Sequence, residues 1–170
     1  PYRLLLSMNW DGTAGPFLLG HGDRLPRVSL AAARDVIAGW GLSMPDVEPL
    51  PLHFGLHDFA NIGETEWWIV NDTDNRYCGK FLFLFDRQRC PLHHHRIKDE
   101  TFFIVRGTVE MEVDGETRLM GPGDVLKVAP GQRHTFAGHG GPALVLEVSL
   151  PSIPGDNLFA DTRIGNDGVL

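Results

Sequence analysis

Positive charge is scarce in this sequence, which has 15 lysine and arginine residues against 22 aspartate and glutamate residues and a formal net charge of −7. Proteins that bind nucleic acids carry basic patches, so we expect no nucleic-acid partner. Apolar runs are short, and none approaches the roughly 20 residues that a membrane-spanning helix needs. The first ten residues are too weakly apolar for a signal peptide. We therefore expect no association with a membrane.

Cysteine is also rare, with only Cys78 and Cys90 in 170 residues. Small secreted domains that depend on a disulfide framework contain more cysteines than this. We therefore expect two free thiols and a cytoplasmic location. Neither cysteine stands beside residues that activate a thiolate, so a cysteine nucleophile is not expected.

Residues 1–50 predict an N-terminal arm followed by one short helix. The first 28 residues are rich in glycine and proline without a clean period, and we expect an irregular arm with one short strand. Ser29 is the predicted N-cap of the helix, and Gly39 or Gly41 is expected to end it.

Strand signals dominate residues 62–150, where short apolar segments alternate with turns rich in glycine and proline. In TVEMEV the apolar residues alternate with glutamates, which is typical of a strand with one buried face. Asp114-Gly115 follows that segment and predicts a hairpin. Many short strands of this kind indicate a sandwich or barrel. Residues 151–170 are predicted to be a C-terminal loop, and the whole chain, 1–170, a single domain.

A cluster of ionisable residues stands where one strand begins, in the segment CPLHHHRIKDETFFIVRG. Side chains alternate along a strand, so His93 and His95 share one face and His94 points away. Glu100 follows beyond a bend, and His134 follows a later strand and a Pro-Gly turn. Three imidazoles and one carboxylate suit a divalent Mn, Fe, Co, Ni or Zn ion. We predict that His93, His95, Glu100 and His134 bind one such ion.

The same residues carry a family resemblance. HHHRIKDETFFIVRG resembles the first sequence motif of the cupins, and GDVLKVAPGQRH resembles the second. The resemblance implies an all-β fold, the cupin double-stranded β-helix or jelly-roll barrel, here with a short N-terminal helix. It also implies one metal ion in the barrel mouth, for which we expect manganese first, and a homodimer. Cupins include dioxygenases, isomerases, epimerases and binding proteins, so the fold alone does not define the reaction.

A narrower resemblance concerns the segments FGLHDF, VNDTDNRYCGKFLFLFDRQRCPLHHH and DETF, and the tail segment DNLF. These are similar to the D-lyxose isomerase family of sugar-isomerising cupins. The resemblance implies a metal-dependent aldose–ketose isomerase for a free sugar, such as D-lyxose/D-xylulose or D-mannose/D-fructose. Two alternatives stay open: an Fe(II)-dependent cupin dioxygenase, and a cupin that binds sugar without catalysis.

Candidate catalytic residues come from the remaining ionisable groups. Glu147 lies in the apolar segment ALVLEVS, where a carboxylate carries a desolvation cost unless it has a partner or a task. We predict Glu147 as the general base and acid, with Lys80 or Lys98 stabilising negative charge on the sugar oxygens. The alternatives are an outward-facing Glu147, a solvent-exposed Lys98, and a Lys80 that pairs only with Asp86.

Two further residues are candidates for binding sugar hydroxyl groups. Gln88 and Arg163 are predicted in this role, although Arg163 has the alternative of fixing the tail. Trp67 and Trp68 cannot both face the barrel interior because successive strand residues point to opposite sides. One of them is therefore a candidate to stack on a sugar, and a place in the core is the alternative for both.

Overall fold

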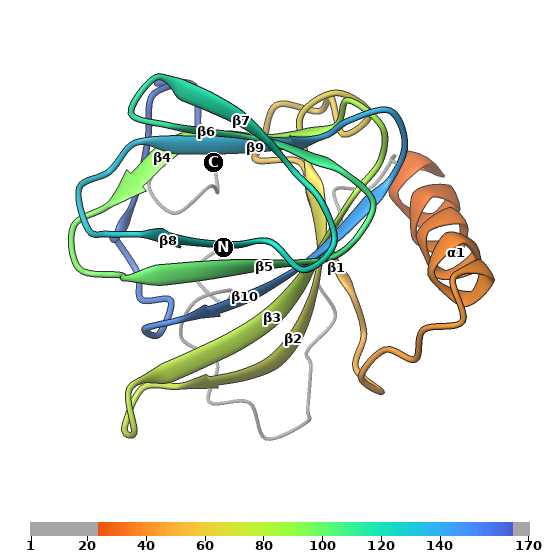
Figure 1. The fold of residues 1–170 in the computed structure, drawn as a ribbon, viewed down its shortest axis with the longest axis horizontal. Coiled ribbons are helices and arrows are strands. Elements are labelled where there is room, and N and C mark those ends of the chain that lie inside the picture. The colour runs from red at the N-terminus through yellow and green to blue at the C-terminus, as the bar shows by residue number, and fades with distance from the viewer. Residues whose placement is uncertain (1–23, 165–170) are drawn as a thin grey trace.

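The structure is a computed structural model of the chain and describes residues 24–164. These residues form the helix α1 (Arg24–Gly39) and two antiparallel sheets that face each other (Figure 1). Sheet A contains, in spatial order, β1 (Leu50–Leu52), β2 (Glu64–Asp72), β3 (Tyr77–Leu84), β10 (Ala143–Ser149), β5 (Glu100–Arg106) and β8 (Val125–Val128). Sheet B contains β11 (Asn157–Phe159), β4 (Arg89–His95), β9 (His134–Gly138), β6 (Val109–Val113) and β7 (Glu116–Met120). The architecture confirms the predicted all-β jelly-roll barrel.

The β6–β7 hairpin forms where the sequence predicts it. Val113 pairs with Glu116 across the turn, and Asp114 and Gly115 have φ angles of 51° and 84°. Two successive positive φ angles are typical of the type I′ turn that connects tightly paired strands. Buried and half-buried residues alternate along β6, as the sequence pattern predicts.

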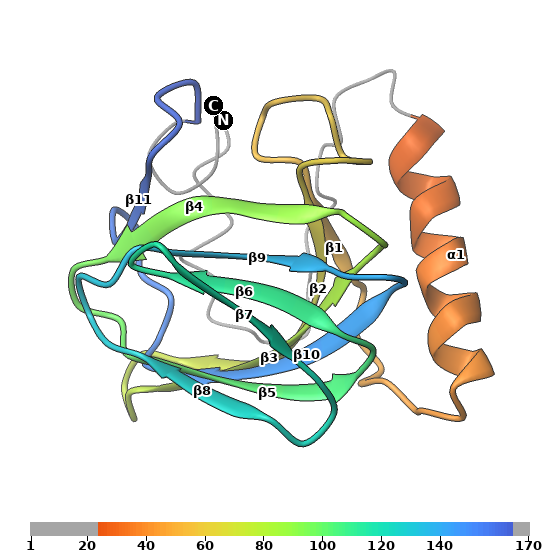
Figure 2. The same ribbon diagram turned by 45° about the horizontal axis from the view of Figure 1, so that its top comes forward.

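Apolar side chains form two clusters, one inside the barrel and one beneath the helix. The interior cluster joins both sheets and includes Leu82, Phe102 and Met111. The second cluster lies on the other face of sheet A, where Ile37 of α1 packs with Trp67 and other strand residues. Figure 2 shows α1 standing beside the barrel. The helix therefore covers part of the outer face of sheet A, on which Phe103 and Val148 remain exposed, and the inner face builds the interior of the barrel.

The helix begins earlier than the sequence suggested. Ser29 lies inside α1, so its prediction as the N-cap is wrong. Pro26 falls in the first turn, where a helix does not use the backbone N–H that proline lacks, so the residues before Ser29 can join the helix. The helix ends at Gly39 as predicted. Gly41 follows with a φ of 71°, which glycine adopts without strain.

The tail is not entirely a loop. Strand β11 pairs with the outer edge of β4, with Asn157 opposite His95 and Phe159 opposite His93. This pairing gives hydrogen-bond partners to backbone groups at the edge of β4, and the composition of the tail does not reveal it. Three statements about domain organisation stay predictions: the arm at 1–50, the barrel at 62–150 and the assignment of the chain to a single domain. The strand expected in the arm falls mainly outside the described residues.

No helix between residues 24 and 164 is long and apolar enough to cross a membrane.

Candidate metal centre and active site

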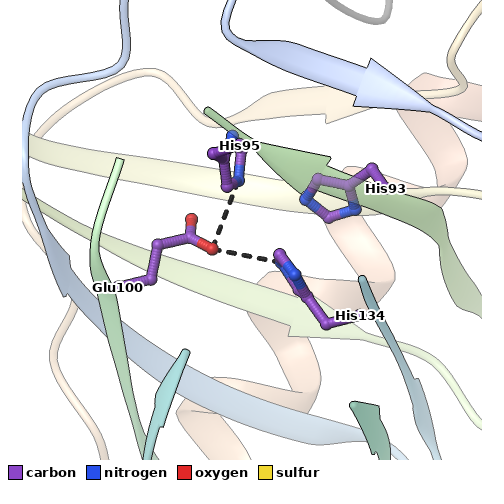
Figure 3. A group of neighbouring side chains, drawn as sticks. All are labelled: His93, His95, Glu100 and His134. Carbon is purple, nitrogen blue, oxygen red and sulfur yellow. Dashed lines mark ion pairs between the residues drawn. The ribbon is translucent and has the colours of Figure 1, made fainter. Parts of the chain in front are cut away.

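Four buried side chains from three strands converge inside the barrel (Figure 3). His93 and His95 come from β4, His134 from the neighbouring β9, and Glu100 from β5 of the facing sheet. Period-two alternation turns both β4 histidines inward, and His93 lies directly opposite His134 in the β4–β9 pair. One ligand atom from each residue lies within 4.8 Å of the others. The structure therefore brings together all four predicted ligands.

Backbone carbonyl groups fix the orientation of each imidazole. The Nδ1 atoms lie 2.8 Å from the Pro91 oxygen for His93, 3.2 Å from the Asp156 oxygen for His95 and 3.1 Å from the Gln132 oxygen for His134. A carbonyl oxygen only accepts, so each Nδ1 carries the proton and donates it. Each Nε2 is left with a free lone pair, as is usual for histidines that bind metals.

The atoms that face the centre of this cluster lack hydrogen-bond partners, and they show whether a cation would fit between them. His95 Nε2, His134 Nε2 and Glu100 Oε2 are buried without a hydrogen bond in the described part of the chain. The two Nε2 atoms nevertheless lie 3.2 and 3.1 Å from Glu100 Oε2. Buried polar atoms without partners are costly, and one divalent ion would satisfy all of them. The donor set therefore fits a divalent metal ion.

The protonation states agree with metal binding. Burial, and then His134 and His95, hold the pKa of His93 well below its usual range, which keeps this ring neutral. Burial by itself would raise the pKa of Glu100, but the positive charge of Lys98 holds it well below its usual range. Neutral imidazole and ionised carboxylate are the forms that bind metals.

A chain of alternating charges runs from the metal cluster across the inner face of sheet A. Lys98 Nζ lies 2.8 Å from Glu100 Oε1 and 2.6 Å from Glu147 Oε1. Lys80 Nζ lies 3.3 Å from Glu147 Oε2 and 2.5 Å from Glu66 Oε1. Glu147 therefore faces inward, Lys98 is 4% exposed rather than in solvent, and Lys80 pairs within the site rather than with Asp86.

This network sets the charge on each member. Burial would lower the pKa of Lys80 and Lys98, but the surrounding carboxylates raise both above the usual lysine value. Burial would raise the pKa of Glu147, but Lys80 and Lys98 lower it. Ser149 Oγ also donates to Glu147 Oε1 at 2.8 Å. Both lysines are therefore protonated and Glu147 is ionised at neutral pH.

One cavity joins the metal cluster to this network. Its lining includes Lys80, Lys98 and Glu147 together with His93, His95 and Glu100. The remaining lining residues are Leu50, Leu52, Phe54, Glu64, Glu66, Trp68, Leu82, Cys90, Phe102, Phe136, Ser152, Asn157 and Phe159. The cavity is thus lined by both charged and apolar groups, which suits a small polyhydroxylated ligand.

The structure does not bring the two predicted sugar-binding residues to this cavity. Gln88 is fully buried, its amide nitrogen donates to the Phe59 oxygen at 2.5 Å, and its amide oxygen accepts from the Phe85 N–H at 3.0 Å. Both polar groups of Gln88 are thus used by the backbone, which corrects the prediction. Arg163 is exposed, forms an ion pair with Asp161 two residues before it and does not line the cavity, and the alternative that it fixes the tail stays a prediction.

The inner face of β2 was missed by the sequence reasoning. Glu64, Glu66 and Trp68 all line the cavity, and Trp68 Nε1 donates to Glu66 Oε2 at 2.9 Å. Trp67 points to the opposite face, against α1. The desolvation argument used for Glu147 applies to both glutamates as well, because they share one face of a strand rich in apolar residues and alternate with Thr65 and Trp67 in ETEWW.

Asp156 is a second residue that was missed. Its carboxylate accepts hydrogen bonds from the backbone N–H groups of Arg96, Ile97 and Lys98 at 3.0, 3.0 and 2.9 Å. These three residues form the bend between β4 and β5. Asp156 therefore fixes the bend that carries Lys98 and, through its own carbonyl, the His95 ring. Only a long-range contact reveals this role.

Comparison with known proteins agrees with the fold. The family profile described as "Cupin domain" matches residues 86–149. Crystal structures of the L-ribose isomerases of Acinetobacter sp. DL28 and Cellulomonas parahominis have TM-scores of 0.70 and 0.67 to this structure, at 14% and 15% identity. The matches cover 83% and 82% of this chain and 92% and 93% of those chains. At this identity they establish the fold alone.

Relatives with higher identity identify the family. The D-lyxose/D-mannose isomerase of Thermosediminibacter oceani is 34% identical over 139 residues, which cover 65% of this chain and 75% of that protein. The D-lyxose ketol-isomerase of Cohnella laeviribosi is 30% identical over 155 residues, which cover 75% of this chain and 84% of that protein. The chain belongs to the D-lyxose isomerase family of cupin sugar isomerases.

Proposed function

We propose that this protein is a metal-dependent aldose–ketose isomerase that interconverts D-lyxose with D-xylulose or D-mannose with D-fructose. The observation that carries the proposal is a buried, ionised Glu147 in the same cavity as His93, His95 and Glu100. The names of the T. oceani and C. laeviribosi relatives support these sugars. Membership of this family favours isomerisation over the dioxygenase and non-catalytic alternatives.

The reaction moves one hydrogen between C1 and C2 of the open-chain sugar and exchanges a carbonyl group for a hydroxyl group. A divalent ion held by His93, His95, Glu100 and His134 would supply Lewis acidity that polarises these two oxygens. Manganese is the ion that we expect, although the donor set accepts several first-row metals.

Glu147 is the group proposed to move the proton. Its carboxylate takes the proton from one carbon and returns it to the neighbouring carbon, as a general base and then a general acid, while the hydroxyl proton passes from one of the two sugar oxygens to the other. Lys80 and Lys98 cannot serve as the base because both hold their protons. They orient the two oxygens of Glu147 and place positive charge where the sugar oxygens become negative.

Direct assay tests the proposal. The Mn²⁺-loaded protein is incubated with D-lyxose, D-mannose, D-xylulose and D-fructose, and each product is separated by chromatography. We expect conversion in both directions for at least one pair, loss of conversion after chelation, and recovery when Mn²⁺ is returned. No interconversion at confirmed metal occupancy would contradict the proposal. The homodimer and the cytoplasmic location stay predictions.

A further inference from the structure

Glu64 is a buried carboxyl group that the charge network leaves without a full set of partners. It is the first residue of β2, lines the cavity and is 4% exposed. Its Oε2 atom has no hydrogen-bond partner among residues 24–164. Glu66, two residues along the same face, differs because Lys80 and Trp68 occupy both of its oxygens.

The surroundings of Glu64 favour a protonated carboxyl group. Burial, and then the neighbouring Glu66, raise its pKa from 4.5 to about 8. The Cys90 thiol is its side-chain hydrogen-bond neighbour, and burial raises the pKa of that thiol well above its usual value. A protonated carboxyl group can both donate and accept, which suits a sugar hydroxyl group, itself a donor and an acceptor.

The position of Glu64 relative to the metal ligands suits the distal part of a sugar. Cys90 Sγ lies 3.9 Å from His93 Nδ1, on the side of the ring that faces away from the converging Nε2 atoms. The Cys90 side chain thus lies between Glu64 and His93, one of the four candidate metal ligands. In sheet A, β3 and β10 lie between β2, which carries Glu64, and β5, which carries Glu100. Glu64 is therefore near the reaction centre without belonging to it.

We propose that Glu64 is a specificity-determining residue whose carboxyl group hydrogen-bonds a hydroxyl group of the sugar beyond C2. This inference rests on the proposed function, because it takes C1 and C2 to be held at the metal ligands and Glu147. A sugar held there extends its remaining hydroxyl groups into the same cavity, where Glu64 Oε2 is an unpartnered oxygen outside the cluster of candidate metal ligands. A site that hydrogen-bonds a hydroxyl group discriminates against analogues lacking it, since its own polar group is then left unpaired.

The test compares D-lyxose with its 3-deoxy, 4-deoxy and 5-deoxy analogues as substrates of the wild-type, Glu64→Leu and Glu64→Gln enzymes. We expect the wild type to prefer D-lyxose over one analogue by about tenfold or more in kcat/KM. Glu64→Leu is expected to lose about tenfold on D-lyxose and little on that analogue, which removes the preference. Glu64→Gln is expected to keep part of it because its amide group also donates and accepts.

A pH profile provides a second readout. The charged and titratable groups that face Glu64 are Glu66, Lys80, Glu147 and Cys90. We expect the wild-type preference for the hydroxyl group to strengthen above pH 8, where Glu64 ionises and a carboxylate accepts a stronger hydrogen bond than a carboxyl group, and the preference of Glu64→Gln to be independent of pH there. The same pH dependence in both enzymes would contradict the inference.

Cys90→Ala is the matched control, because it removes the thiol beside Glu64 and leaves the carboxyl group. We expect it to retain a preference for the hydroxyl group. An equal loss on D-lyxose and on every analogue in Glu64→Leu would make Glu64 structural and overturn the inference. Absence of turnover by the wild type would instead contradict the proposed function. In that case the affinity for D-lyxose, measured by calorimetry for the wild type and Glu64→Leu, would decide the inference. Equal affinity of the two proteins, or no binding by either, would overturn it.

Discussion

Replacing Glu147 by glutamine tests the centre of the proposed mechanism, because it removes a charge and nearly preserves shape. Glu147 Oε1 lies 2.6 Å from Lys98 Nζ and 2.8 Å from Ser149 Oγ, and Oε2 lies 3.3 Å from Lys80 Nζ. Removing one partner of a buried ion pair usually costs about 3–5 kcal/mol. Each lysine here retains a second carboxylate partner, so we expect a loss nearer ~2 kcal/mol of unfolding free energy. That corresponds to a fall of about 4–8 °C in melting temperature.

The loss of activity should be far larger than this change in stability explains. Removal of a general base typically lowers the rate by a factor of about 100 or more, or about 2.7 kcal/mol of activation free energy. The assay is the initial rate from D-lyxose to D-xylulose at 25 °C, with metal content measured on the same sample. Glu112→Gln, at a half-buried position on β6, is the control. A folded, metal-loaded Glu147→Gln enzyme within tenfold of wild type would refute the assignment of the base.

Three other substitutions test separate parts of the structure. His134→Ala should weaken metal binding at least about tenfold, measured as metal retained after dialysis, and unchanged retention would exclude His134 as a ligand. Gly107→Ala should cost roughly 3 kcal/mol or more, because φ is 77° and the added Cβ would lie 2.2 Å from the Pro142 oxygen. A urea midpoint equal to that of wild type would contradict this. Glu64 keeps its proton in the folded state up to about pH 8 but loses it near 4.5 when unfolded, so its stabilising contribution falls as pH rises between these values. From pH 5 to pH 8 the urea midpoint of the wild type should therefore fall relative to that of Glu64→Gln. A difference between the two midpoints that stays constant over this range would contradict the raised pKa.

The candidate metal ligands were accessible from the sequence because the signals that mark them are local. Alternation along one strand turns His93 and His95 to the same side, and that statement needs no knowledge of the rest of the fold. The same rule groups Glu147 with one face of its strand but does not say whether that face is the inner one, because apolar residues occupy both faces. It likewise groups Glu64 and Glu66 on one face of β2, the face that lines the cavity.

The partners of the polar residues were not accessible in this way. Gln88 looked like a ligand for a hydroxyl group, yet Phe59 and Phe85 use its amide group because the chain folds back around it. Asp156 looked like part of a loop, yet it caps the bend before β5. Both roles depend on contacts between residues that the sequence does not mark as neighbours.

The sequence by itself determined the all-β class, the turn at Asp114-Gly115 and the set of imidazoles and carboxylate that suits a metal ion. Alternation and turn preferences act over a few residues, so they can be deduced without coordinates. The tertiary structure decided the charge states of Lys80, Lys98 and Glu147. Lys98 and Glu147 are 49 positions apart, and only strand pairing and burial bring them within 2.6 Å. Electrostatic energies depend on such distances and on exclusion of water, which no local pattern encodes.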